Sequence, residues 1–177
     1  MAADNPLGCK SNAWDDFSVE ERRTISIVED WDFGFLAGDQ LLRHKVADRH
    51  MHDEACEELK KFFLVKILRD PHPMGCFGPV IAAALHAFIL DTQRYEEFCA
   101  KTYGKTIHHK PSNYGKGVLD NTTWMAMYRE WFGDFPRVWK MDLNGQEIPG
   151  FEHSMNVAGN VSSADMDSDD GAFAVIT

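Results

Sequence analysis

Three histidines and one cysteine lie close together in the sequence, and their side chains are of the types that bind transition metals. His86, Cys99, His108 and His109 all fall between residues 85 and 111. Imidazole nitrogens and thiolates are common ligands of zinc, copper and iron. One hypothesis is therefore a metal site built from His86, His108 and His109, with Cys99 as a weaker fourth ligand.

The elements expected around these residues allow such a meeting without requiring it. Helices are predicted at about 79–90 and 92–103, and a turn near Asp91 would fold them against each other. The remaining gap of about 10 Å between His86 and the histidine pair can be bridged by four extended residues of about 3.3 Å each. The alternative, which we favour, is that the histidines are core and capping residues around a turn at Gly104.

A second group of potential ligands precedes the longest predicted helix. Its members are His44, His50, His52 and Cys56. His52 and Cys56 have the i, i+4 spacing of side chains on one helical face, provided that the helix begins before Asp53. The many charged residues nearby indicate instead a stretch that faces the solvent.

Other kinds of catalytic group have less support in the sequence. It contains no Gly-x-Ser-x-Gly nucleophile motif, and Cys99 is expected in the core, where a thiol is unreactive. The acidic pairs Glu57-Glu58 and Glu96-Glu97 are expected on the outer faces of helices, as solvated charge. The sequence therefore leaves open whether the protein is an enzyme.

Hydrophobic periodicity predicts an all-α protein, a compact bundle of five or six helices. Ser18 and Glu21 form a capping-box pattern at the start of the first long helix. A further helix is predicted at about 54–69, with Asp53 as its cap. A last helix follows residue 121, and it carries a stripe of large side chains at helical spacing: Trp124, Met127, Tyr128, Trp131 and Phe132. No stretch alternates polar and apolar residues well enough to predict a sheet.

The composition divides the chain into three parts. We expect an irregular arm at residues 1–16, the helical domain at residues 17–143, and a flexible, disordered acidic tail at residues 144–177. The tail ends in a short apolar segment, whose Phe173, Val175 and Ile176 are candidate partner-binding residues for docking to another protein. The alternative is a frayed end that binds no partner.

Residues 85–111 contain a regular pattern of residue types: His86, Ile89-Leu90, Thr92, Tyr95, Phe98-Cys99, Gly104, His108-His109 and Pro111. The pattern resembles the signature of the plant glycine-rich-domain-protein type of family and its bacterial relatives, and the likeness extends over residues 54–140. Ala82 and Leu85 stand where that family has Asp and Trp, and its glycine-rich tail is missing. Since the family has no settled biochemical activity, the resemblance implies a fold and no reaction.

Composition and charge argue against several classes of function. The net charge of −10 and the lack of a basic stripe argue against nucleic acid as a partner. No window approaches the roughly 18 apolar residues of a membrane helix, and no signal peptide is recognised, so we expect a cytoplasmic protein without membrane insertion. Our leading hypothesis is a small intracellular helical protein that acts as a protein-interaction or assembly module. The alternative is a His-ligated metal-binding protein or metalloenzyme that uses His86, His108 and His109.

Overall fold

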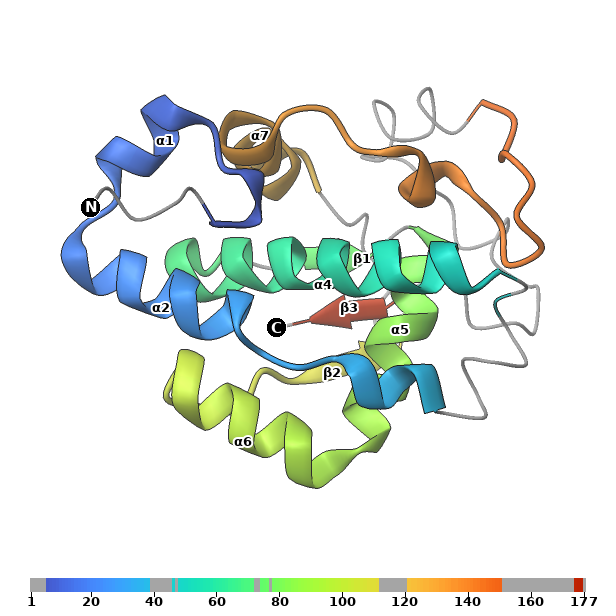
Figure 1. Ribbon diagram of the computed structural model, residues 1–177, viewed down its shortest axis with the longest axis horizontal. Coiled ribbons are helices and arrows are strands. Elements are labelled where there is room, and N and C mark those ends of the chain that lie inside the picture. The colour runs from blue at the N-terminus through green and yellow to red at the C-terminus, as the bar shows by residue number, and fades with distance from the viewer. Residues whose placement is uncertain are drawn as a thin grey trace.

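The computed structural model of the protein is mostly helical, which confirms the predicted helical class (Figure 1). It describes residues 6–38, 46, 48–71, 74–76, 78–111, 121–150 and 174–176. The α-helices of these residues are α1 (Ser11–Asp16), α2 (Val19–Glu29), α4 (Arg49–Arg69), α5 (Pro79–Leu90), α6 (Thr92–Thr102) and α7 (Thr122–Phe132). The short 3₁₀ helices within the same described residues are η1 (Pro6–Gly8), η2 (Gly34–Gly38) and η3 (Arg137–Lys140). None of the helices described is long and apolar enough to cross a lipid bilayer.

Local capping chemistry determines where several helices begin. The predicted capping box of α2 is present, since the Glu21 amide donates to Ser18 Oγ and the Ser18 amide donates to a Glu21 carboxylate oxygen. The predicted start of α4 is wrong. That helix begins at Arg49, because Asp48 accepts a hydrogen bond from the His50 amide at 3.0 Å. The arm predicted to be irregular also contains helix α1.

Helix α4 lies at the centre of the molecule and packs against α2, α5, α7, η2 and η3. In Figure 1 it runs across the view, while α7 is seen nearly end-on above it. Phe62 and Phe63 are both fully buried, although neighbouring helical residues point to different sides. The Phe63 ring meets Phe88 and Phe98 on one side, and the Phe62 ring meets Trp124 on the other. The core therefore surrounds α4.

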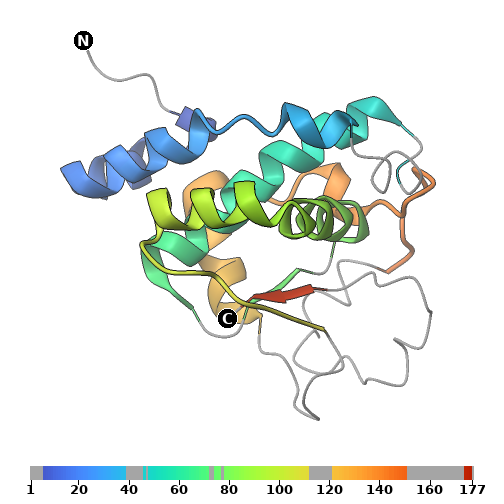
Figure 2. The ribbon, with the colours of Figure 1, turned by 90° about the horizontal axis from the view of Figure 1, so that it is seen from below.

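A small sheet, which the sequence did not predict, lies beside α5 (Figure 2). Its strands are β1 (Met74–Cys76), β2 (His109–Pro111) and β3 (Ala174–Ile176), in the order β1-β3-β2. Both pairings are antiparallel, and Val175 is the register partner of Gly75 and of Lys110. Three residues are too few to show an alternating pattern, which is why the expectation of no sheet was wrong.

The predicted tail falls partly outside the described residues. Its first residues, 144–150, begin within a tight turn in which Asp142 Oδ1 accepts hydrogen bonds from the amides of Asn144 and Gln146. Residues 151–173, including Phe173, lie outside the residues that the structure describes, so the predicted disorder there stays a prediction. Val175 and Ile176 lie in β3, between two other strands of the same chain.

Candidate functional site

The structure brings two of the three candidate histidines into contact. Nε2 of His86, on α5, lies 3.1 Å from Nε2 of His109, on β2. The ring centroids are 4.9 Å apart and the ring planes are nearly perpendicular, at 89°. Both residues are partly exposed. The two nitrogens therefore face each other at the junction between the helices and the sheet.

The chain between these histidines turns twice, and both turns have local causes. Asp91 lies between α5 and α6, and its carboxylate caps α6 by accepting from the Arg94 amide. Gly104 ends the second turn with a φ of +77°, a conformation that other residues adopt at a cost. The Tyr95 hydroxyl then donates to the Ile107 carbonyl at 2.6 Å and holds the returning chain against α6. The next residues consequently run back towards α5.

The other two candidate ligands do not join the pair. Successive side chains of an extended chain alternate in direction, and here Ile107 is buried, His108 is exposed and His109 is half-buried. Cys99 is buried beside Tyr95, and burial raises the pKa of its thiol. Within the described part of the chain, no group of three or more His, Cys, Asp or Glu residues is placed to hold a metal ion.

The His86–His109 contact is compatible with two kinds of chemistry. Without a metal, one Nε2–H donates to the other Nε2, so the two rings share a proton. Burial lowers the pKa of His109, which favours the neutral ring. With a metal, two nitrogens on bonds of about 2.0–2.1 Å would lie about 3 Å apart, so the observed separation also suits two ligands of one ion.

A buried carboxylate was missed by the sequence reasoning. Glu58 was expected to be solvated, but it is only 3% exposed, whereas its neighbour Glu57 is exposed. The Glu58 carboxylate accepts hydrogen bonds from the Tyr128 hydroxyl, from Trp139 Nε1 at 2.7 Å and from Lys61 Nζ at 2.7 Å. It thereby ties α4 to α7 and η3. The missed signal was spacing, because Glu58 precedes Phe62 by four residues on the same apolar stripe.

The second ligand group is partly assembled because α4 begins early. His52 and Cys56 face each other one turn apart, with 3.9 Å between His52 Nδ1 and Cys56 Sγ. Burial raises the pKa of Cys56 to about 12, so its thiol stays protonated at neutral pH. His50 lies on the exposed side of the helix, and His44 lies outside the described residues. Any ligand role for this group stays a prediction.

Comparison with known proteins gives a family. A search of the curated proteins and a search of the solved structures each found no significant match. The profile of the UCP032817-like family matches residues 24–131, more than half of the chain. The matched region runs from within α2 to the last turn of α7 and includes both His86 and His109. The resemblance to the glycine-rich-domain type of family stays a prediction. The chain belongs to the UCP032817-like family.

Proposed function

We propose that the protein is an interaction or assembly module. In this proposal, its binding site is the position between strands β1 and β2 that β3 occupies in the structure. The observation that carries this proposal is the strand order β1-β3-β2. The central strand comes from residues 174–176, far along the chain from both of its neighbours, and it pairs with each of them. An extended apolar peptide is the kind of segment that such a place accepts.

The surroundings of β3 support a role in strand addition. Neighbouring strands lie about 4.8 Å apart, so β1 and β2 are separated by about 10 Å and cannot pair with each other. Without β3, the backbone groups that both strands direct towards it would lose their partners. Helix α5 packs against β1 and β3, and Met74 and Cys76 of β1 are fully buried. We call this place between β1 and β2 the strand slot.

The length of the connecting segment makes exchange between two molecules feasible. Residues 151–173 join β3 to the rest of the protein, and 23 extended residues can span up to about 75 Å. The same strand can therefore reach its own strand slot or that of a second copy. We propose that assembly proceeds by this exchange, which in a symmetric pair gives a strand-swapped dimer.

The test is a proline at the centre of β3. Val175→Pro removes a backbone donor from a strand that is paired on both sides, where proline is excluded. Val19→Pro is a matched control, because Val19 is 86% exposed and holds the first position of α2, where proline is favoured.

Light scattering over a range of concentrations should show dimers of the wild-type protein and of Val19→Pro. The Val175→Pro protein should remain a monomer and should bind a synthetic peptide of residues 170–177 more tightly than a scrambled peptide. The same assembly in Val175→Pro as in the wild type would contradict the proposal. A wild-type protein that is monomeric at every concentration would also contradict it.

One observation favours a second function, which is His-ligated metal binding. The 3.1 Å separation of the His86 and His109 nitrogens suits two ligands of one ion. Protein produced with added zinc, copper and iron should then contain one metal ion per chain. His86→Ala and His109→Ala should each lose it, whereas the exposed control His50→Ala should retain it. Absence of metal from the wild-type protein, or equal loss in the control, would contradict this function.

We further propose that the protein works in the cytoplasm and that nucleic acid is not its partner. Its four cysteines are buried and none forms a disulfide within the described residues, which is the form that a reducing compartment maintains. Its net charge of −10 would repel a phosphate backbone. Cell fractionation and a gel-shift assay with duplex DNA and single-stranded RNA test these two proposals.

A further inference from the structure

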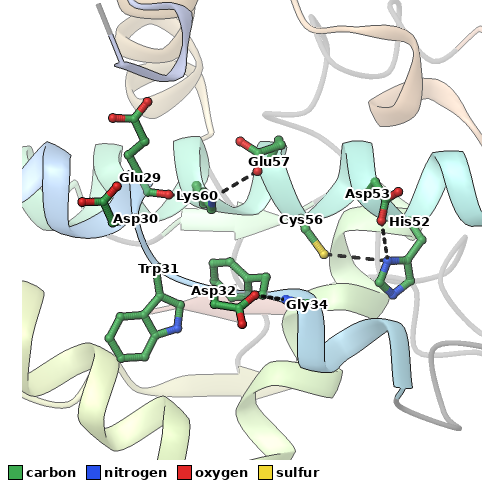
Figure 3. Close-up of a pocket in the computed structure, with 11 residues that line it drawn as sticks. Glu29, Asp30, Trp31, Asp32, Gly34, His52, Asp53, Cys56, Glu57 and Lys60 are labelled. Carbon is green, nitrogen blue, oxygen red and sulfur yellow. Dashed lines mark hydrogen bonds and ion pairs between the residues drawn. The ribbon is translucent and has the colours of Figure 1, made fainter. Parts of the chain in front are cut away.

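An acidic pocket lies between α4 and the connection from α2 to η2 (Figure 3). Its volume is about 360 Å³, which falls within the range of small-molecule sites. One wall comes from residues 29–34, and the other comes from one face of α4. The residues of the second wall are His52, Asp53, Cys56, Glu57 and Lys60.

The pocket carries a strong excess of negative charge. Five acidic residues contribute to its lining, against a single basic residue, Lys60. The carboxylate of one of them, Glu29, is turned towards η1 and accepts a hydrogen bond from the Leu7 amide. Lys60 is already engaged, since its Nζ lies 3.1 Å from Glu57 and donates to the Glu29 carbonyl at 2.8 Å. Asp30 and Asp32 form no ion pair with any residue that the structure describes, and Asp32 Oδ1 accepts a hydrogen bond from the Gly34 amide at 2.7 Å. The C-terminal end of α2 adds the partial negative charge of its carbonyl groups.

An independent feature of the pocket is a buried nitrogen without a partner. His52 is 6% exposed, and none of the residues that the structure describes forms a hydrogen bond with its Nε2. Its Nδ1 lies 3.7 Å from an Asp53 carboxylate oxygen and 3.9 Å from Cys56 Sγ, and a proton on Nδ1 would leave Nε2 as an acceptor. Figure 3 shows the His52 ring extending from α4 beside Cys56, at one end of the pocket. A ligand with an N–H group would satisfy this acceptor.

We propose that this pocket binds a small organic polycation, of the class of linear aliphatic polyamines. Its ammonium groups would bond to the carboxylates of Asp30, Asp32 and Asp53 and to Nε2 of His52. Its methylene segments would lie against the rings of Trp31 and Phe33, which line the same pocket. A polyamine suits this site better than a metal ion, because no group of three metal ligands is assembled among the described residues.

The test is calorimetric titration of the full-length protein with spermidine. We expect one saturable site per chain and no heat from 1,8-octanediol, which has a similar length and no charge. Asp30→Asn and Asp53→Asn should each weaken binding by about tenfold, the usual effect of losing a charge-assisted hydrogen bond. Glu97→Gln is the matched control, because Glu97 is an exposed carboxylate on α6, outside the pocket. Its effect should stay within about twofold.

A second measurement concerns His52 directly. On addition of spermidine, the ¹⁵N resonance of His52 Nε2 should move, while that of the exposed His50 should stay in place. Failure of spermidine to bind would overturn the proposal. Equal weakening in the pocket variants and in Glu97→Gln would also overturn it, because binding would then reflect diffuse attraction to an acidic protein.

Discussion

Replacing Glu58 by Ala should destabilise the protein more than any exposed carboxylate substitution. The side chain is 3% exposed and accepts hydrogen bonds from Tyr128, Trp139 and Lys61. The first two donors are almost completely buried, at 1% and 0% exposure. Without the carboxylate, their hydroxyl and indole N–H groups would have neither their present acceptor nor ready access to water.

The expected size of the effect follows from these contacts. Leaving a buried donor without an acceptor costs about 1–3 kcal/mol, so Tyr128 and Trp139 together account for about 2–6 kcal/mol. Lys61 adds little, because its partly exposed ammonium can be solvated. Removal of a buried charge recovers part of its desolvation energy, so we expect a net loss of about 3–4 kcal/mol. Glu58→Gln keeps one carbonyl acceptor and should lose about 1–2 kcal/mol.

The assay is urea unfolding at pH 7, followed by circular dichroism and by tryptophan fluorescence. Glu97→Ala serves as the control, since that exposed i, i+4 pair with Lys101 is worth about 0.5 kcal/mol or less. A double-mutant cycle between Glu58→Gln and Tyr128→Phe should show a coupling of about 1 kcal/mol or more. A loss below about 1 kcal/mol in Glu58→Ala would refute the reasoning, because the donors would then have found other acceptors.

Three further predictions concern other residues. Burial lowers the pKa of His109, so the unfolded chain binds the proton more readily, and stability should fall as the pH drops below about 6.5. His109→Gln should flatten this dependence in urea midpoints, and an unchanged slope would contradict it. Lys66 lowers the pKa of Asp70 to about 2, so its stabilisation is present above about pH 4 and is lost as the pH falls towards 2. Acid unfolding of Asp70→Asn should therefore show a weaker pH dependence over that range. Gly104→Ala should cost about 1 kcal/mol, or a few degrees in Tm, because its Cβ meets open space and only the φ of +77° opposes it.

Local chemistry in the sequence was enough to place most helices. Ser18, Asp91 and Gly104 act on their immediate neighbours, and each performs the capping or turning role expected of it. The start of α4 could not be predicted in this way, because Asp48 and Asp53 are both aspartates and are equally suited to cap the helix. The choice depends on packing, because the earlier start places Met51 and His52 in buried positions. Such tertiary preferences do not appear in a single sequence.

Only part of the candidate site could be predicted from the sequence. The two turns showed that His86 could meet the histidine pair, but the sequence did not say which of the two would face it. The register of β2 decides this, and that register depends on pairing with β3, far along the chain. Glu58 was misjudged for a related reason. A carboxylate is normally expected to be exposed to solvent. Glu58 is buried because hydrogen-bond donors from two other elements, α7 and η3, surround it.

The position of β3 also has a consequence for the order of folding. Met74 and Ile176, which pair in the sheet, are about 100 residues apart in the chain, whereas α5 and α6 adjoin directly at Asp91. Closing a loop of this length costs about 1.4 kcal/mol more than closing one of about 20 residues. The helices should therefore collapse first and the sheet should close last. In the native protein the same strand should open most readily, so the amides of β1 and β2 should exchange with solvent well before those of α4.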